Sequence, residues 1–371
     1  MNDGKEYENK NRGVKRLQIP SYTFRHSFED GFPAITNKKL YWKTITGELL
    51  WFLRGDNDVT KLNEIGIKIW NKDAYNWYVK THKNAYDWHL KNKKINDAGV
   101  DGLIENSDGS FRMYTFEEFE AIGEGSVGQN YSVQWRNFNG NTDQISILIH
   151  DMLKDIMSSR LKVNAWNPSE TNETALPPCH SEFQIIGVPL SDVERCKIAG
   201  ISPVEWEGIC ESGLEMESLE LVPEFGFELH WNQRSVDTFL GLPFNIASYG
   251  LLAKILEMFT GFKALAIEGT LKCVHFYDNQ YDVVKELLKR NPDTHSNCEL
   301  KFHNLKANRV IKDVFIMAVE NSDKFDIKEV ISWISSNLNM FLDDISFLDF
   351  KLEGYTCDSE LKVEMLAPKE C

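Results

Sequence analysis

The chain has 371 residues, of which 42% are hydrophobic and 12% aromatic, so it can bury one large core or two ordinary ones. Its formal charge of −15 opposes non-specific binding to nucleic acid, because such binding needs a basic face that displaces counterions. A small anionic molecule stays compatible with this charge where arginines cluster locally.

The N-terminal segment, the apolar runs and the cysteines indicate a cytosolic protein. The segment MNDGKEYENKNRGVKR is charged and lacks the apolar region of a signal peptide. No apolar run approaches the roughly 18 residues that a membrane span needs. The seven cysteines include no C-x-x-C pair, which gives no support to a zinc ribbon or a thioredoxin-like site. Scattered, reduced thiols are typical of the cytosol.

The first periodic segment in chain order is residues 44–66, TITGELLWFLRGDNDVTKLNEIG, where leucines recur at helical spacing. Gly55 interrupts this pattern, so we expect a helix that ends there. Residues 224–232, EFGFELHWN, instead alternate between apolar residues and the polar pair Glu228 and His230. Such alternation predicts a strand with one face buried.

Two helices are expected farther along the chain. Residues 242–262, LPFNIASYGLLAKILEMFTGF, predict a long buried helix, with Pro243 suited to its first turn and Gly261 to its end. Residues 323–341, DKFDIKEVISWISSNLNMF, predict an added amphipathic helix that packs on the rest of the protein. Helices and strands therefore mix along the chain.

Three segments, near residues 71–128, 190–222 and 285–345, are richer in charged and polar residues than their surroundings. We interpret them as insertions around a tighter core. Because the chain shows no internal repeat and no low-complexity linker, it predicts a single domain over residues 1–371.

The stretch ALPPCHSEFQ, residues 175–184, places Cys179 beside His180. Free cysteine is among the most buried side chains, so a core residue is the ordinary interpretation, with a metal ligand and a nucleophile as alternatives. A thiolate nucleophile would need a nearby cation to form.

Polar residues concentrate between the predicted strand and the predicted long helix. This segment, NQRSVDTFLGLPFNIASY, holds Gln233, Arg234, Ser235, Asp237 and Asn245. A surface loop would explain any one of them. Five such groups beside two apolar elements favour a functional site, because unpaired polar groups are costly to bury.

Two further places carry candidate groups. Glu48 directly precedes the apolar run LLWFL, and a carboxylate at the start of a helix is often only a favourable partner of the helix dipole. His275 and Tyr277 are two residues apart in HFYDN, so their side chains share one face if the segment is a strand. The alternative is that both are polar residues of the core.

Taken together, these stretches resemble thymidylate synthases, and they occur in the order in which that family carries them. The matching stretches are DGFPAIT (30–36), ELLWFLRGDND (48–58), IKIW (67–70), NYSVQWR (130–136), VNAWNPSE (163–170), ALPPCH (175–180), QRSVDTFLGLPFNIASY (233–249), HFYDN (275–279), LEGY (352–355) and AP near the end. The blocks QRSVDTFLGLPFNIASY and ALPPCH are long enough to make a chance match negligible, so Cys179 is interpreted as a nucleophile. The resemblance implies an α/β (α+β) three-layer fold with a large mixed β-sheet flanked by helices.

The resemblance also implies a mechanism. A Cys179 thiolate adds to C6 of dUMP, and C5 then attacks the one-carbon unit of 5,10-methylenetetrahydrofolate. Arg234 matches an arginine near that sulfur and the substrate phosphate, where its charge favours the thiolate. Glu48, Tyr131 and His180 match groups that organise water and move protons. No metal is implied.

Other residues match contacts with the nucleotide. Asn245 matches the residue that reads the pyrimidine edge, donating to O4 and accepting from N3–H, which favours uracil over cytosine. The resemblance implies a homodimer, in which Arg160 reaches the phosphate of the second subunit. The other substrate-binding matches are Arg12 and Ser235 at the phosphate, His275 and Tyr277 at the sugar 3′-hydroxyl, and Gln233.

The folate region departs from the family pattern. Trp70, Asp73 and Asp237 match its positions, with Asp237 holding the pterin. The usual IWDEW is IWNKD here, so Asp73 stands where a second tryptophan is usual, and Tyr75 or Trp77 could supply the missing ring. A carboxylate in a loosened folate wall would let water reach the exocyclic methylene, which gives 5-hydroxymethyl-dUMP and unoxidised tetrahydrofolate.

Two more departures are Ser159 before Arg160, where an arginine pair is usual, and LKC at 271–273 in place of Leu-Gly-Asp. The pattern resembles the phage nucleotide hydroxymethylases, a branch of the same family, and Asn245 implies dUMP rather than dCMP. The main prediction is therefore a cytoplasmic dUMP hydroxymethylase (in the host cytoplasm for a viral protein) that binds neither nucleic acid nor membrane. The alternative is a thymidylate synthase that makes dTMP and dihydrofolate. An inactive member that binds nucleotide or RNA is disfavoured by Cys179 and Glu48.

Overall fold

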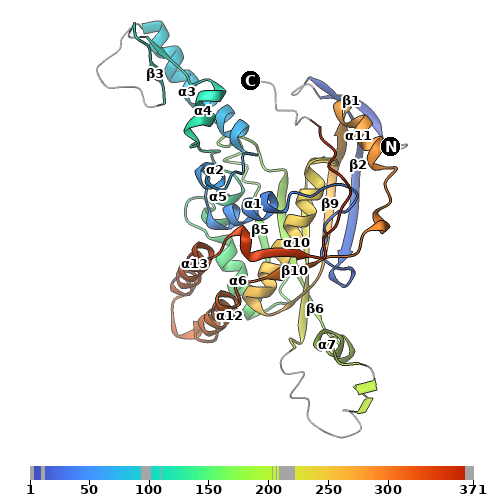
Figure 1. Ribbon diagram of the computed structural model, residues 1–371. Helices are drawn as coiled ribbons and strands as arrows, with labels where there is room; N and C mark the ends of the chain where they lie inside the picture. Colours follow the sequence, from blue (N-terminus) through green and yellow to red (C-terminus); the bar gives the residue numbers. More distant parts are fainter. Residues whose placement is uncertain are drawn as a thin grey trace.

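A mixed β-sheet forms the centre of the molecule. The computed structural model describes residues 4–9, 13–92, 102–108, 110–202, 204–205, 207–208 and 222–363. In these residues seven strands run in the order β1-β2-β9-β7-β6-β5, with β8 beside β9 (Figure 1). Neighbours are antiparallel except that β7 and β8 run parallel to β9. The strands are β1 (Lys5–Asn9), β2 (Val14–Ser27), β5 (Lys162–Asn164), β6 (His180–Pro189), β7 (Phe225–Gln233), β8 (Val236–Asp237) and β9 (Lys263–Tyr277).

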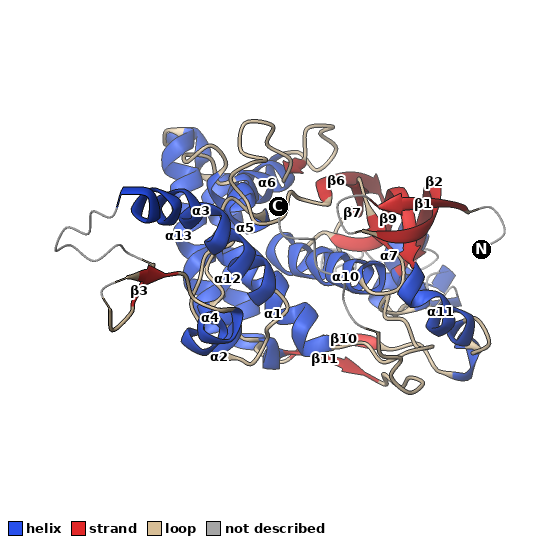
Figure 2. Ribbon diagram, turned by 90° about the horizontal axis from the view of Figure 1, so that it is seen from above, coloured by secondary structure: helices blue, strands red, loops and turns tan. Residues whose placement is uncertain are grey.

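Helices cover one face of this sheet. Helix α10 (Gly241–Thr260) packs on β7, β8 and β9, and α1 (Trp42–Arg54), α6 (Gln144–Lys154) and α12 (Leu305–Glu320) pack on α10 (Figure 2). The predicted fold, a large mixed sheet flanked by helices, is therefore confirmed. The other helices are α2 (Thr60–Glu64), α3 (Asn71–Asn92), α4 (Phe116–Ile122), α5 (Tyr131–Asn137), α7 (Asp192–Ala199), α11 (Tyr281–Leu287) and α13 (Ile327–Asp344).

Short elements complete the described chain. Two two-stranded sheets lie outside the main sheet: the hairpin of β3 (Ile104–Glu105) with β4 (Phe111–Arg112), and β10 (Glu299–Phe302) paired with the distant β11 (Phe350–Glu353). The 3₁₀ turns are η1 (Phe28–Asp30), η2 (Asp278–Gln280), η3 (Pro292–Thr294), η4 (Ser322–Lys324) and η5 (Phe347–Asp349).

The four periodic segments adopt the predicted structures. Helix α1 ends where Gly55 takes a left-handed conformation with φ 80°, and α10 ends in the same way at Gly261 with φ 79°. Pro243 lies in the first turn of α10, where its missing N–H leaves no helical hydrogen bond unmade. In β7 the predicted apolar side, with Phe227 and Leu229, is buried on the helix-covered face.

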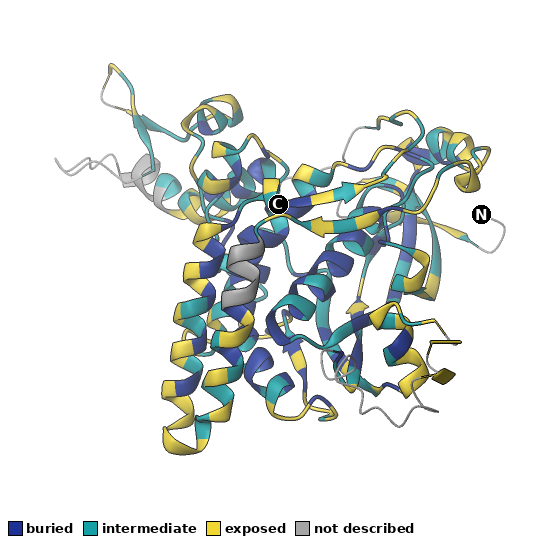
Figure 3. Ribbon diagram, turned by 60° about the horizontal axis from the view of Figure 1, so that its bottom comes forward, coloured by how far each residue is buried: buried dark blue, intermediate teal, exposed yellow. Residues whose placement is uncertain are grey.

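The first and third polar segments contribute side chains to the main hydrophobic core, such as Tyr78 and Phe315, so they are not separate from it. Residues 71–128 supply α3, the β3–β4 hairpin and α4, and residues 190–222 supply α7, with 203, 206 and 209–221 lying outside the described residues. The chain between β10 and β11 supplies α12 and α13; over residues 311–320 of α12 and along α13, buried and exposed residues alternate at helical spacing (Figure 3). Helix α13 matches the predicted amphipathic helix, and its packing on α6 and α1 explains the apolar stripe.

Candidate active site

The backbone around Cys179 is held from two sides. Cys179 directly precedes β6, and its C=O accepts a hydrogen bond of 2.8 Å from the Arg234 N–H. Its own N–H donates to the hydroxyl of Tyr131 at 2.6 Å, and the His180 N–H donates to the same oxygen at 3.3 Å. These bonds fix the peptide that carries the thiol, and Cys179 is half-buried rather than enclosed in the core.

The Arg234 guanidinium lies against the peptide that precedes Cys179. Its Nε donates to the carbonyl of Pro178 at 2.8 Å and its Nη2 donates to the carbonyl of Pro177 at 2.7 Å. The guanidinium also stacks on Trp166, 5.3 Å from the ring centroid. These contacts hold a cation beside the loop that carries Cys179, where the sequence predicts that it stabilises a thiolate.

Polar side chains lie close together where β6 begins and β7 ends. His180 pairs with Gln233 in the β6–β7 ladder, and the Gln233 amide donates to Asn245 Oδ1 at 3.1 Å and to the Ser235 carbonyl at 3.2 Å. Burial lowers the pKa of His180 to about 4, and a hydrogen bond with Asn245 opposes that shift. The His180 ring is therefore neutral at pH 7.

Glu48 is connected to Tyr131 through the indole ring of Trp70. It lies in the middle of α1 rather than at its start, so the helix-dipole interpretation does not apply. Burial raises the pKa of Glu48 to about 7, and the Trp70 indole, which donates to Glu48 Oε1 at 2.8 Å, opposes that shift. The Trp70 and Tyr131 rings lie 6.4 Å apart. A carboxyl with this pKa can accept and release a proton near neutral pH.

His275 and Tyr277 share one face of β9, as predicted. They are only 3% and 5% exposed, and their ring centroids are 4.9 Å apart. Asp237 lies opposite His275 in the β8–β9 ladder. Its Oδ1 accepts hydrogen bonds from the Phe239 and Leu240 N–H groups, each at 3.0 Å, which fixes it at the start of α10.

Gly241, at the start of α10, lies close to both Asp237 and Asn245. A Cβ atom on this glycine would lie 3.7 Å from Asn245 Oδ1 and 3.7 Å from the Asp237 Cβ. The structure thus brings Asp237 next to Asn245, the residue that hydrogen-bonds both Gln233 and His180. The structure therefore brings Asp237, Asn245 and His180 into one neighbourhood.

The segment that the resemblance assigns to folate forms the start of α3. Asp73 lies in the first turn of α3, three residues after Trp70. Tyr75 donates to the Tyr114 carbonyl at 3.1 Å and packs on Phe116 of α4, with ring centroids 5.5 Å apart.

Trp77 lies one helical turn after Asp73, near the segment that leads to Tyr131. A Cβ atom on Gly128 would be 3.0 Å from the Trp77 ring. Of the two rings considered as replacements for the missing tryptophan, Trp77 is therefore the one that lies close to Gly128, three residues before Tyr131.

One predicted phosphate contact, Arg160, has no described contact with this site. Arg160 is exposed just before β5, and its N–H donates to Ser158 Oγ at 3.3 Å. The described contacts do not link Arg160 to Cys179 or Arg234 within one chain. Arg12 lies outside the described residues.

Three residues join the site without having been singled out. Lys38 donates to the Phe239 carbonyl, and burial lowers its pKa to about 8 against the opposing charge of Asp237. Tyr249 stacks on Trp231 at 4.5 Å and approaches His180 at 5.4 Å, measured between ring centroids. Gln280 donates to Asp237 Oδ2 at 2.9 Å. The motif blocks contain or adjoin Tyr249 and Gln280, but a lysine in NKKL carries no signal of burial.

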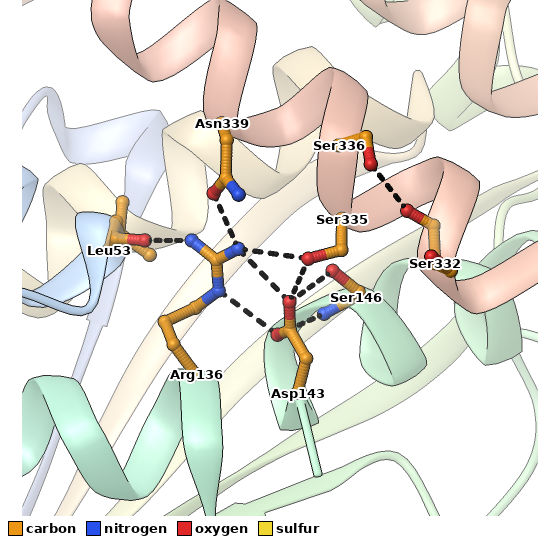
Figure 4. Close-up of polar contacts among 8 residues, drawn as sticks. All are labelled: Leu53, Arg136, Asp143, Ser146, Ser332, Ser335, Ser336 and Asn339. Atoms are coloured by element: carbon orange, nitrogen blue, oxygen red, sulfur yellow. Dashed lines mark hydrogen bonds and ion pairs between the residues drawn. The ribbon is translucent and has the colours of Figure 1, made fainter. Parts of the chain in front are cut away.

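A buried ion pair anchors the helix that carries Tyr131. Arg136, in the last turn of α5, pairs with Asp143 at 3.0 Å and donates to the Leu53 carbonyl of α1 (Figure 4). Its Nη2 also donates to Asn339 Oδ1 at 2.8 Å and Ser335 Oγ at 3.3 Å, both on α13. The helix of Tyr131, the helix of Glu48 and α13 are thereby tied together.

Within the described residues, no cluster of histidine, cysteine and carboxylate groups has the arrangement of a metal site. None of the described helices is both long and apolar enough to span a membrane.

Comparison with known proteins gives a consistent result. Residues 1–367 match the family model described as thymidylate synthase. Thymidylate synthase of Malacoplasma penetrans is 33% identical over 297 residues, which cover 80% of this chain and 82% of that protein. The enzyme of Aster yellows witches'-broom phytoplasma is 30% identical over 361 residues, covering 95% and 91%. A probable thymidylate synthase of Escherichia phage T5 is 32% identical over 287 residues, covering 77% and 79%.

Proposed function

Because this chain belongs to the thymidylate synthase family, we propose that it methylates dUMP at C5 with 5,10-methylenetetrahydrofolate, giving dTMP and dihydrofolate. The observation that carries the proposal is the fixed Cys179 peptide, held between the Tyr131 hydroxyl and Arg234, beside the Asn245 amide. The proposal includes a cytoplasmic homodimer that shares its phosphate sites.

Some buried polar atoms beside Trp70 and Tyr131 have no hydrogen-bond partner among the described residues, so they are available to a polar ligand. Three buried polar atoms at the starts of α3 and α5 have no partner among the described residues: Asn71 Oδ1, Asn130 Nδ2 and Gln134 Oε1. Buried polar atoms are normally paired, so a nucleotide, a folate or ordered water would satisfy them. These residues flank Trp70 and Tyr131, and they fit a site for a polar aromatic co-substrate.

The chemistry follows from the residues in place. The Cys179 sulfur forms a bond to C6 of the uracil, which turns C5 into a nucleophile, and the same bond breaks when product leaves. When bound, the folate supplies the one-carbon unit and the hydride that reduces it. Glu48, which titrates near pH 7, and the Tyr131 hydroxyl are the groups that can pass protons to and from the ring.

Base selection rests on Asn245. Its Oδ1 accepts from the Gln233 amide, which fixes the orientation of the side chain and aims its own N–H donors away from Gln233. A fixed donor suits O4 of uracil, whereas cytosine presents a donor at that position.

A second product is favoured by one observation. Asp73 places a carboxylate in the first turn of α3, directly after the Trp70 segment, where water could be admitted to the exocyclic methylene. This is the main prediction made from the sequence, 5-hydroxymethyl-dUMP. The relatives compared are named thymidylate synthases, and Trp77 supplies a ring close by, so methylation is better supported.

One assay separates the two products. The purified protein is incubated with dUMP and 5,10-methylenetetrahydrofolate in heavy-oxygen water. Methylation predicts dihydrofolate absorbance equal to the nucleotide consumed and an unlabelled dTMP mass. Hydroxymethylation predicts no dihydrofolate and one heavy oxygen in the nucleotide, a result that would replace the proposed product.

A further inference from the structure

Cys273 has a backbone conformation that its residue type disfavours. Its φ is 45°, and Asn139 is the other non-glycine residue with positive φ in the described chain. Asparagine enters this region with help from its short polar side chain, but cysteine has no such help. A residue with such a disfavoured conformation is held in it by the surrounding structure, and such residues are often found at functional sites.

The ladder between β2 and β9 accommodates this turn. Ile19 pairs with Val274 and Ser21 pairs with Lys272, so Pro20 lies opposite Cys273. Proline has no N–H to donate, and the strand can therefore twist at this point without the loss of a ladder hydrogen bond.

The twist directs the Cys273 carbonyl to His275. The distance from this oxygen to His275 Nδ1 is 2.6 Å. Because a carbonyl only accepts hydrogen bonds, Nδ1 carries the proton, and the neutral imidazole keeps a lone pair on Nε2. The backbone of His275 is fixed as well, since its own carbonyl accepts from Thr238 N at 2.8 Å and Thr238 Oγ1 at 2.9 Å.

We propose that Cys273 is a positioning residue for substrate binding. Its left-handed backbone holds His275 in the Nδ1–H tautomer, so that Nε2 accepts the proton of the sugar 3′-hydroxyl. This inference rests on the proposed function, from which the contact with the 3′-hydroxyl is taken; what it adds is the role of Cys273 in setting the His275 tautomer.

Substitutions at position 273 test the backbone requirement. Glycine adopts positive φ without strain, whereas valine is β-branched and disfavours it strongly. Cys273→Gly should keep the tautomer, and Cys273→Val should release the carbonyl from His275. If the valine variant fails to fold, Cys273→Ala, which has no branch at Cβ, replaces it in the same measurements. Asn139→Val is the matched control, because it places the same residue in the same backbone region away from His275.

The direct readout is the ¹⁵N chemical shifts of the imidazole in protein without ligand, with the His275 signals assigned by their loss in His275→Asn. The unchanged protein, Cys273→Gly and Asn139→Val should show protonated Nδ1 and unprotonated Nε2. In Cys273→Val these shifts should move toward the opposite tautomer.

Kinetics supplies the second readout. Cys273→Val should raise KM for dUMP roughly tenfold, the scale of one lost hydrogen bond, with kcat within twofold. The same variant should leave binding of 2′,3′-dideoxyuridine monophosphate unchanged, because that analogue lacks the hydroxyl.

An Nε2–H tautomer in the unchanged protein would overturn the proposal, as would equal effects of Cys273→Val on both nucleotides. A protein with the expected tautomer that binds no dUMP would instead contradict the proposed function, while the positioning of His275 by Cys273 would stand.

Discussion

At the scale of single residues, burial tunes the chemistry of the site. Glu48 and His180 both lie where the charged form is disfavoured, so the pKa of the carboxyl rises to about 7 and that of the imidazole falls to about 4. At pH 7 the histidine is a neutral hydrogen-bonding group. Glu48 is the group whose protonation changes near working pH, which suits it to proton transfer.

Glu48→Gln tests this difference. The folded protein holds the Glu48 proton up to about pH 7, whereas in the unfolded chain the same carboxyl, with its ordinary pKa of 4.5, loses the proton earlier. Between these values the folded state binds more protons than the unfolded state, so Glu48 lowers stability as pH rises through this range. The variant should lose at least a hundredfold in kcat and, at pH 8, gain roughly 3 kcal/mol of stability relative to the unchanged protein. Urea unfolding at pH 5 and pH 8 measures the gain, and equal stability differences at both values would contradict the account.

Asn245→Asp tests base selection. An ionised aspartate accepts hydrogen bonds but cannot donate them, so it should pair better with the amino group of cytosine. The ratio of kcat/KM for dUMP to that for dCMP should fall by the equivalent of about 1–3 kcal/mol. If this ratio does not change, Asn245 does not read the base.

At the scale of elements, α13 supports two helices that carry site residues. Its Ser335 and Asn339 contact the Arg136–Asp143 pair, and Arg54 at the end of α1 donates to the Leu342 and Ile345 carbonyls at the end of α13. An added helix thus completes hydrogen bonds of buried charges, which makes its contacts costly to lose.

Substitution of the neighbouring residues Ser335 and Ser336 on α13 allows that cost in stability to be measured. Ser335 Oγ donates to Asp143 Oδ2 at 2.7 Å, whereas Ser336 Oγ donates to the Ser332 carbonyl of its own helix at 2.9 Å. Ser335→Ala should destabilise the protein by about 1–3 kcal/mol, because a buried charge loses a partner. Ser336→Ala should stay within about 0.5 kcal/mol of the unchanged protein. Urea denaturation compares the two, and indistinguishable midpoints would show that α13 does not support the ion pair.

The elements also show how far local sequence carries a structure prediction. Gly55 and Gly261 end helices where expected, and the alternation over 224–232 matches the buried face of β7, because both patterns depend on neighbouring residues. Lys38 and the left-handed Cys273 were not foreseen, since their environments come from residues far away in the chain, such as Phe239 and Pro20. The site motifs were found through family resemblance, while the bond between Gln233 and Asn245 needed the fold to appear.

At the scale of the whole molecule, the proposed dimer gives Arg160 a role. This residue is exposed and has no described contact with Cys179 or Arg234 of its own chain, although the resemblance assigns it to a phosphate site. A second subunit that brings its Arg160 to the neighbouring site would resolve this separation. The partner would also neutralise part of the anionic substrate in a chain with a formal charge of −15.

Mixed dimers test this arrangement. Cys179→Ser and Arg160→Ala protomers are each inactive or strongly impaired by the proposal. Heterodimers of the two contain one site with both residues intact, so mixing should restore up to half of the activity per heterodimer. Activity measured after unfolding and refolding the mixture checks this. A fully active monomer in sedimentation experiments would refute the shared site.

The most direct test of the account is covalent capture of Cys179 by a substrate analogue. 5-Fluoro-dUMP carries fluorine where dUMP loses a proton, so the proposed reaction should stop after the nucleotide and folate have joined the enzyme. Intact-protein mass spectrometry with 5,10-methylenetetrahydrofolate should show a mass increase equal to one nucleotide plus one folate, and peptide mapping should place it on Cys179. Cys179→Ser should show no adduct. An unmodified mass in the presence of both ligands, or an adduct on another cysteine, would contradict the role of Cys179 as the nucleophile.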